Sequence, residues 1–174
     1  MKKFLIVVDM QKDFVDGALG TPEAVKIVPN VVEKIKGFDG DIIVTYDTHF
    51  DNYMETSEGK NLPVPHCIKG TNGWTLNEDV QKALDGKKYT VVEKPTFGSV
   101  ELPKIVSKIA ENEPFSVELI GLCTDICVVS NALLLKASFP EVLISVDSSC
   151  CAGVTVESHN AALQTIKMCQ IDIK

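Results

Sequence analysis

Short apolar runs without alternation recur along the chain, and each ends at a polar residue or a glycine. Continuous runs of Val, Ile and Leu are typical of strands that are covered on both faces of a parallel sheet. The pattern predicts strands at residues 4–9, 41–47, 89–94, 115–121 and 141–147, with residues 171–174 as a short sixth strand.

The segments between these runs have the spacing of amphipathic helices. Residues 24–36 carry apolar side chains at Val25, Val28, Val32 and Ile35. Similar patterns predict helices at residues 77–84, 99–110, 125–138 and 156–168. Because strands and helices alternate, we expect right-handed crossovers and a three-layer α/β/α fold with a mostly parallel six-stranded sheet. The length of 174 residues suits one such domain over residues 1–174.

One connection differs from the others. Residues 48–73 are polar, rich in Gly and Pro, and too long for a plain link between two elements. Loops of this length inside a compact domain are usually functional or disordered.

Composition narrows the possible partners and the compartment. The net charge is −7, which argues against nucleic acid or an anionic membrane surface as the main partner. No apolar run approaches the roughly 18–20 residues that span a bilayer, and the amino-terminal run is too short for a signal peptide. We therefore expect a cytoplasmic protein. Its six cysteines would be mostly reduced thiols, and they form no CxxC pair of the kind that zinc ribbons use.

The predicted strands end in residues that can take part in catalysis or bind a metal ion. The first ends at Asp9, the second at Asp47-Thr48-His49, the third at Lys94, and the fourth enters the sequence GLCTDIC at residues 121–127. Ligands of open α/β sheets bind beyond the carboxyl ends of the strands. We therefore expect an acid, an acid–imidazole pair, an amine and a thiol to meet at one edge of the sheet.

Cys127 is the candidate nucleophile. Thr124 or Asp125 is a suitable N-cap, so Cys127 would lie in the first turn of the following helix. The positive end of the helix dipole and Lys94 would both stabilise a thiolate and lower the thiol pKa. The competing interpretation is a buried structural cysteine, which is the commoner fate of a lone Cys.

Cys123 comes at the end of the strand, before the cap. In this turn the N–H groups of Cys123 and Cys127 can point towards a common position, as in an oxyanion hole. A redox pair is the alternative, but the strand-to-helix turn should hold the two side chains apart. We therefore expect Cys123 to contribute its amide, with a small apolar side chain.

Asp9 and Lys94 are the candidate partners of the thiol. A carboxylate at the mouth of a buried strand is partly desolvated, which raises its pKa towards the range of a general base. A lysine at the end of a buried strand needs an anionic partner, and Asp9 or the thiolate would serve. The competing interpretations are a loop-capping acid and a solvated lysine.

The long loop is bracketed by possible metal ligands. Asp47 and His49 leave one strand end together, and His66 could complete the set. Mixed oxygen and nitrogen donors suit zinc, manganese or iron(II). Glu58 could add an oxygen, although a solvated surface acid is the commoner case. The remaining histidine, His159, falls in a helical stretch.

Five motifs occur in the order of a known family: VVDMQKDF, YDTHF, VPHCIKGT, EK at residues 93–94, and GLCTDICV. Together they resemble the isochorismatase-like cysteine hydrolase superfamily, and within it the nicotinamidase/pyrazinamidase branch. The resemblance implies the six-stranded fold and a cis peptide between Leu122 and Cys123. It implies a triad, an oxyanion hole from two amides, and one divalent metal ion, most often zinc with manganese or iron as alternatives. The corresponding residues are Asp9, Lys94 and Cys127 for the triad, Cys123 and Cys127 for the oxyanion hole, and Asp47, His49, His66 and the additional acid Glu58 for the metal.

The expected substrate contacts depart from that branch at one place. Phe14, Phe97 and Leu122 are the expected neighbours of the substrate ring. Nicotinamidases usually carry an aromatic residue three positions before the last histidine ligand, where this chain has Pro63.

The resemblance implies hydrolysis of nicotinamide to nicotinate and ammonia through a cysteine thioester, in NAD salvage. The partner would be a small-molecule amide, and the protein would form a homo-oligomer. A ureido, carbamoyl or other small primary amide is the alternative substrate. A catalytically silent binding protein is the alternative of another class, and the intact triad argues against it.

Overall fold

The computed structural model describes all 174 residues and contains a six-stranded sheet with strand order β3-β2-β1-β4-β5-β6. All five pairings between neighbouring strands are parallel. The predicted parallel sheet is therefore confirmed, including its short last strand. The strands are β1 (Lys2–Val8), β2 (Asp41–Asp47), β3 (Tyr89–Lys94), β4 (Phe115–Leu122), β5 (Leu143–Ala152) and β6 (Asp172–Ile173).

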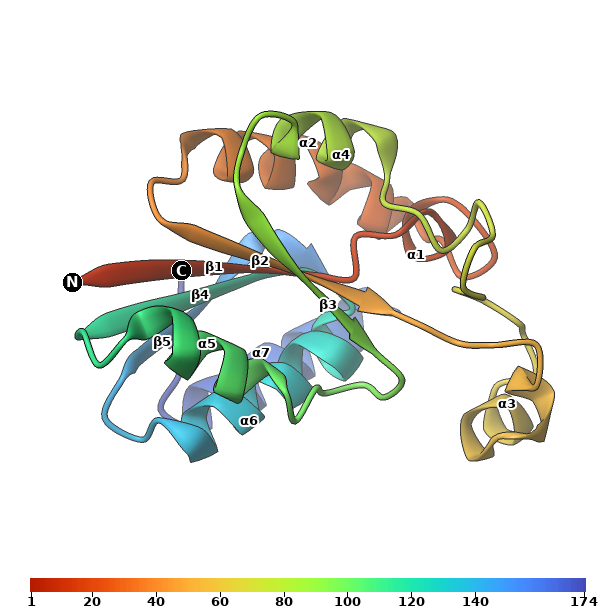
Figure 1. The fold of residues 1–174 in the computed structure, drawn as a ribbon. Coiled ribbons are helices and arrows are strands. Elements are labelled where there is room, and N and C mark those ends of the chain that lie inside the picture. The colour runs from red at the N-terminus through yellow and green to blue at the C-terminus, as the bar shows by residue number, and fades with distance from the viewer.

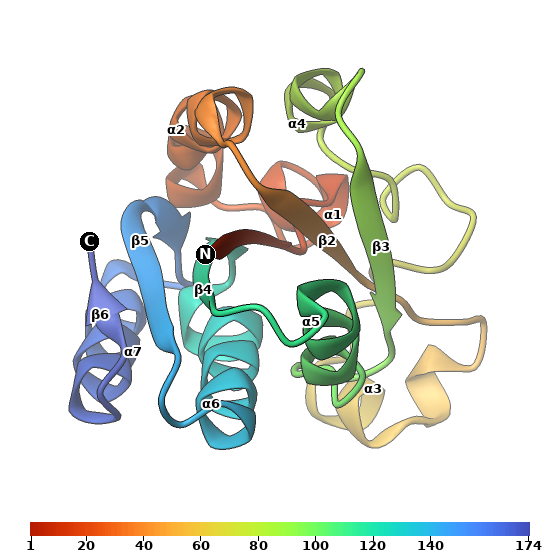
Figure 2. The same cartoon turned by 60° about the vertical axis from the view of Figure 1, so that its left-hand side comes forward.

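Helices cover both faces of the sheet and complete the three layers (Figure 1). On one face lie α2 (Pro22–Gly37) and α4 (Glu78–Leu84). On the other lie α5 (Leu102–Ala110), α6 (Val129–Ser138) and α7 (Val156–Met168), as the rotated view also shows (Figure 2). None of the helices is long and apolar enough to cross a membrane.

Helix α2 illustrates how the local sequence sets an element. The Thr21 side chain accepts a hydrogen bond from the Ala24 N–H at 3.0 Å, and Pro22 follows in the first turn, where it needs no N–H partner. The buried stripe differs from the predicted one, because Val25 is 48% exposed. The residues that pack against the sheet are Ala24, Ile27, Val28, Val31 and Ile35.

The largest differences from the predicted elements lie near the carboxyl ends of the strands. β5 extends to Ala152, beyond the predicted end at residue 147, and its pairing with β4 shifts register between Leu119 and Gly121. Three short helical segments were not predicted. They are α1 (Lys12–Val15), the 3-10 turn η1 (Tyr53–Glu55) and α3 (Ser57–Asn61), and the last two lie within the long loop at residues 48–73.

The order of the strands places a crevice beside β1. The chain moves outwards through β2 and β3 on one side of β1, and through β4, β5 and β6 on the other. In open α/β sheets this reversal separates the loops that follow the two central strands and leaves room for a ligand. Asp9 follows β1 and Cys123 follows β4, so both lie at this crevice.

Candidate functional site

The predicted site residues converge at the carboxyl ends of four neighbouring strands. Asp9 follows β1, Asp47 is the last residue of β2, Lys94 is the last residue of β3, and Cys127 lies in the turn after β4. Asp9 and Lys94 are fully buried, and Cys127 is only 4% exposed. Charged side chains are rarely this buried without partners, so their contacts decide what they can do.

Lys94 connects the candidate triad. Its Nζ lies 2.6 Å from Asp9 Oδ2 and donates hydrogen bonds to Cys127 Sγ at 3.4 Å and Asp47 Oδ1 at 3.2 Å. A third donated bond, also 3.2 Å long, goes to the carbonyl oxygen of Thr96. The contact with Asp9 is the shortest of the four, and it joins two opposite charges. An ammonium has three protons, so these four acceptors share them.

The Asp9 carboxylate is held in position from one side. Thr45 donates a 2.6 Å hydrogen bond to Asp9 Oδ1, and the Asp9 backbone N–H donates to Thr45 in turn. Asp9 has φ = 47°, which residues other than glycine adopt infrequently. Burial raises the pKa of Asp9, and Lys94 only partly opposes this. A buried carboxylate with a raised pKa can accept a proton.

The turn that carries Cys127 differs from the prediction in its capping. Residues Thr124–Val128 form a single π-helical turn before α6, and no side chain caps it. Thr124 and Asp125, the predicted caps, serve other partners. Thr124 Oγ1 lies 2.8 Å from His159 Nδ1, and the Asp125 carboxylate accepts the Val154 N–H. Both contacts tie the turn to the segment after β5.

The predicted low pKa of the Cys127 thiol is wrong. Burial raises this pKa well above its usual value, and the nearby charge of Asp9 raises it further, whereas Lys94 lowers it too little to compensate. The effect of burial on the thiol pKa is therefore larger than the stabilisation of a thiolate by the start of the helix. Cys127 rests as a thiol, and it becomes a nucleophile only when its proton is removed.

Cys123 shows the backbone features expected from the sequence. The Leu122–Cys123 peptide is cis. The Cys123 N–H donates no backbone hydrogen bond, whereas its carbonyl accepts from Ile126 and Val128. Cys123 packs against the core on the α2 side of the sheet, and Cys127 belongs to the core on the α6 side. Their side chains therefore occupy opposite layers, and all six cysteines are free.

A second cluster lies beside Lys94. Asp47, His49, Glu58 and His66 each offer one ligand atom, and these four atoms lie within 4.8 Å of one another. His49 Nε2 is 2.9 Å from Asp47 Oδ2, and Glu58 Oε1 is 3.5 Å from Nε2 of each histidine. The backbone carbonyl of Val64 accepts from His66 Nδ1 at 2.8 Å, which directs His66 Nε2 into the cluster.

The charges of this region suit a divalent cation. Asp9, Asp47 and Glu58 supply three carboxylates against the single ammonium of Lys94, so two negative charges remain when the imidazoles are neutral. Without a metal, the imidazoles take up protons. Burial opposes this, but Asp47 and Glu58 outweigh it and raise the pKa of His49 to about 9. The same carboxylates raise the pKa of His66 to about 10.

Asp47 joins the two clusters, and Gln11 holds Asp47. One carboxylate oxygen of Asp47 faces Lys94 and the other faces both histidines. The fully buried Gln11 amide accepts from the Asp47 N–H at 2.8 Å and donates to the Asp47 carbonyl at 2.9 Å and the Trp74 carbonyl at 2.8 Å. Gln11 lies in the motif VVDMQKDF, but the sequence alone does not indicate this role.

Asp13, in the same motif, anchors the loop that carries His66. Its Oδ2 accepts the Cys67 N–H at 2.8 Å, and Cys67 has φ = 46°. The sequence around Asp13 does not indicate this contact, because the partner lies 54 residues away. Gln11 thus positions Asp47, and Asp13 positions the loop of His66, across long separations in sequence.

The metal-ligand cluster and Cys127 line one cavity of about 750 Å³, whereas Asp9 and Lys94 are fully buried and do not line it. The expected ring neighbours Phe14, Phe97 and Leu122 all line it, together with Cys123 and Cys127. Phe14 also lies against the His66 ring, with 5.3 Å between centroids. Pro63 is exposed and does not line the cavity, although Leu62 does.

Comparison with known proteins relates this geometry to a family. The sequence matches the Isochorismatase domain family over residues 3–173. It is 32% identical over 143 residues to an uncharacterized isochorismatase family protein, PncA, of Bacillus subtilis (strain 168), and the match covers 76% of this chain and 78% of that protein.

Solved structures extend the comparison over the whole fold. A nicotinamidase/pyrazinamidase PncA from Bacillus subtilis matches with a TM-score of 0.85 and 26% identity, covering 99% of both chains. A pyrazinamidase of Pyrococcus horikoshii in complex with zinc matches with a TM-score of 0.78 and 28% identity, covering 100% of this chain and 99% of that one. The family predicted from the motifs is confirmed: the chain belongs to the isochorismatase family, and its similarity to these enzymes identifies it as an amidohydrolase.

Proposed function

We propose that this protein hydrolyses nicotinamide to nicotinate and ammonia through a thioester on Cys127. The observation that carries the proposal is the contact of one buried ammonium, Lys94, with a thiol, a buried carboxylate, and the metal-ligand cluster. Cys127 and the metal-ligand cluster line one cavity, so a single amide can meet the nucleophile and the cluster together.

The first half of the reaction forms the thioester. Asp9 takes the proton of the Cys127 thiol, and Sγ attacks the carbonyl carbon of the amide. The N–H groups of Cys123 and Cys127 stabilise the oxyanion of the tetrahedral intermediate. Asp9 then gives its proton to the leaving nitrogen, the C–N bond breaks, and ammonia departs.

The second half regenerates the enzyme. Asp9, again a carboxylate, takes a proton from water, whose oxygen attacks the thioester carbon. The C–S bond breaks, nicotinate forms, and Asp9 returns its proton to the thiolate. Lys94 stays protonated throughout, because burial opposes its charge but Asp9, Cys127 and Asp47 outweigh that cost and raise its pKa. Its positive charge stabilises the Cys127 thiolate and the Asp9 carboxylate when each forms.

The second cluster orients the substrate. Asp47, His49 and His66, with Glu58 as a fourth donor, would hold one divalent ion, zinc in the first instance with manganese or iron(II) as alternatives. When bound, the ion supplies a Lewis-acidic contact for the pyridine nitrogen. Phe14 and Leu122 then provide apolar walls for the ring, beside the nucleophile.

Ammonia release from a panel of amides tests this function. We expect turnover of nicotinamide and of pyrazinamide, which presents a similar ring nitrogen, and loss of both after chelator treatment with recovery on adding zinc. Benzamide lacks that nitrogen and should be poor. Faster turnover of benzamide or of a ureido amide would show instead that the protein is an amidohydrolase for a ureido, carbamoyl or other small primary amide. No ammonia from any amide would indicate a silent binding protein.

Two further properties belong to the same proposal. We place the enzyme in the cytoplasm, in agreement with its free thiols, and in NAD salvage. We also propose that it assembles as a homo-oligomer. Light scattering at working concentration tests the assembly, and a mass of one chain, 19.0 kDa, would contradict it.

A further inference from the structure

The cavity is larger than a single-ring amide requires. Its volume of about 750 Å³ lies in the upper part of the range of roughly 300–1,000 Å³ that holds drug-sized ligands. Cys127 and the metal-ligand cluster line the end of the cavity at which the amide reacts. Nicotinamide, with one six-membered ring and one carboxamide, fills only the space between those groups and leaves the outer part of the cavity free.

The outer part is apolar and partly open to solvent. Leu62, Phe97 and Val154 line the cavity, and they are 38%, 46% and 51% exposed. Single exposed apolar side chains are common, but these three come from different loops and surround one hollow. Leu19 and Ile126, both half-buried, extend the same lining inwards. Side chains of this kind gain stability when an apolar ligand covers them.

Charge defines what this part of the cavity excludes. No lysine or arginine lines the cavity, and its only carboxylates, Asp47 and Glu58, belong to the metal-ligand cluster. The other polar side chains of the lining are uncharged: Thr21, Thr56, Ser57, Asn61 and Thr96. A charged substituent on the substrate would therefore lose water without gaining an opposite charge. An uncharged apolar substituent would meet side chains that match it.

We propose that Leu19, Leu62, Phe97, Ile126 and Val154 form a subsite for an uncharged apolar group attached to the substrate ring. The preferred substrates are then aromatic primary amides that are larger than nicotinamide and carry an alkyl or aryl extension. The inference rests on the proposed function, because it assigns the outer part of the same cavity in which Cys127 attacks the amide.

A series of substituted nicotinamides tests the subsite. We expect kcat/KM to rise from nicotinamide to its methyl, propyl and phenyl derivatives, with at least one ring position giving about a tenfold gain for phenyl, because apolar area is buried. A carboxylate-bearing derivative should be at least about tenfold poorer than nicotinamide. If every phenyl derivative is slower than nicotinamide, or the carboxylate derivative is faster, the subsite does not exist.

A pair of matched variants locates the effect. Val154→Lys places a cation in the proposed subsite, whereas Val91→Lys places one on β3 at a valine of similar exposure, 48%, that does not line the cavity. Val154→Lys should reduce the phenyl-to-nicotinamide ratio of kcat/KM about tenfold and raise relative turnover of the carboxylate derivative. Val91→Lys should leave both ratios unchanged. Equal effects of the two variants would overturn the proposal.

Three outcomes separate this inference from others. Turnover of nicotinamide without any gain from apolar groups would defeat the subsite and leave the proposed function standing, whereas no ammonia from any of these amides would defeat the function itself. If Val154→Lys changes the assembly measured by light scattering but not the substrate ratios, the apolar rim is a contact between copies of the chain, and the subsite is wrong.

Discussion

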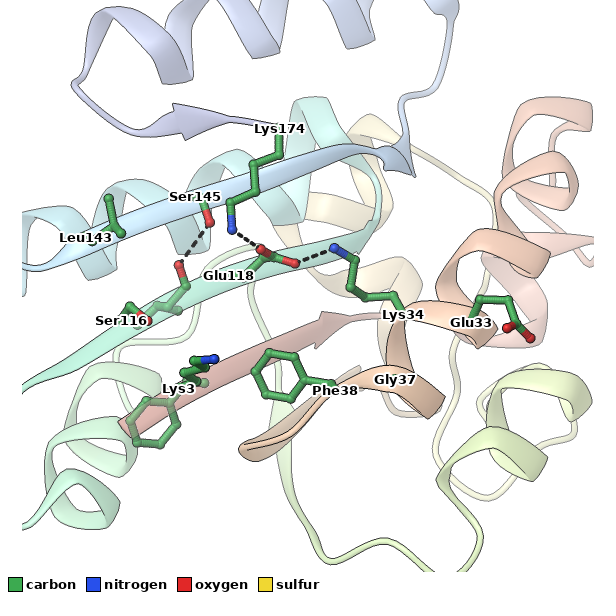
Figure 3. Close-up of a pocket in the computed structure, with 12 residues that line it drawn as sticks. Lys3, Glu33, Lys34, Gly37, Phe38, Ser116, Glu118, Leu143, Ser145 and Lys174 are labelled. Atoms are coloured by element: carbon green, nitrogen blue, oxygen red, sulfur yellow. Dashed lines mark hydrogen bonds and ion pairs between the residues drawn. The ribbon is translucent and has the colours of Figure 1, made fainter. Parts of the chain in front are cut away.

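The two ends of the sheet both carry hollows with charged side chains, but the charges are arranged differently. At the amino ends of β1, β4 and β5, a cavity of about 470 Å³ is bordered by Lys34, Glu118 and Lys174 (Figure 3). Lys34 lies 2.7 Å from Glu118 and 2.6 Å from Asp147, and Lys174 also pairs with Glu118. Two ammonium groups thus balance two carboxylates, and all but Asp147, which is 7% exposed, are at least partly exposed.

At the carboxyl ends, one lysine faces an excess of acids. Lys94 is fully buried between Asp9 and Asp47, beside a thiol, so one ammonium faces two carboxylates. Balanced and solvated pairs at the amino end contribute modestly to stability and leave nothing reactive. Buried groups with incomplete pairing are costly to keep, and they are able to exchange protons or bind a cation. This difference, more than the number of charges, distinguishes the active end.

Removing the nucleophile should have the largest effect. Cys127→Ala should lower amide hydrolysis by at least about four orders of magnitude, because no other group can form the thioester. Cys151→Ala, at an equally buried thiol in β5, should keep most activity, as should Cys123→Ala, because alanine retains the amide. Ammonia release under matched conditions measures all three. Equal losses for Cys123→Ala and Cys127→Ala would reverse the assigned roles.

Removing a lysine should lower the free energy of unfolding much more at the carboxyl ends of the strands than at the amino ends. Lys94→Met leaves Asp9 buried without its counter-charge and should lower the free energy of unfolding by about 3–5 kcal/mol. Lys34→Met, at the amino end, removes a partly exposed partner and should cost about 1 kcal/mol or less. Urea denaturation of the metal-free proteins gives both values. Similar costs for the two variants would break the comparison.

Loosening the hold on Asp47 should weaken metal binding. Gln11→Leu keeps the bulk of the side chain but removes its bonds to the Asp47 backbone, so affinity for zinc should fall about 10–100-fold. Competition with a chromophoric chelator measures this. Gln81→Leu is the control, because Gln81 makes only long contacts in α4, at 3.4 and 3.5 Å. Unchanged affinity in Gln11→Leu would show that Asp47 needs no such support.

The smallest predicted effect is a pH dependence at the amino end. Burial opposes ionisation of Glu118 and Asp147, but their lysine partners outweigh it and lower both pKa values. Their contribution to stability is therefore present above the unfolded carboxyl pKa of about 4 and is lost as pH falls through the lower folded values. Lys34→Met should remove part of this loss. Stability curves for wild type and variant that stay parallel from about pH 5 to about pH 3 would contradict it.

The sequence predicted most of the sheet because each predicted strand is an apolar run that ends at a polar residue or a glycine, although β5 continues past Asp147 to Ala152. Asp9, Asp47 and Lys94 could be placed at one edge for the same reason, since parallel strands share their carboxyl ends. Gln11 and Asp13 could not be found this way. Their partners, Asp47 and Cys67, are 36 and 54 residues away, and local spacing carries no information about such contacts.

The thiol pKa shows a second limit of sequence reasoning. A helix start and a nearby lysine both favour a thiolate, and both are visible in the sequence. Burial is not, because it depends on how β4, α6 and the strand-end side chains pack around Cys127. In the structure burial dominates, so activation of the sulfur passes to Asp9. The cavity likewise depends on loops whose lining residues are scattered along the chain.

The central claim is that the unbalanced end of the sheet performs acyl transfer through Cys127. Rapid-quench mass spectrometry of the zinc-loaded protein during nicotinamide turnover tests it most directly. We predict a nicotinoyl adduct, formed and consumed at rates compatible with kcat, on the peptide that contains Cys127, and no adduct in Cys127→Ala. Nicotinamide hydrolysis that continues in Cys127→Ala, or an acyl group found on another residue, would contradict the account.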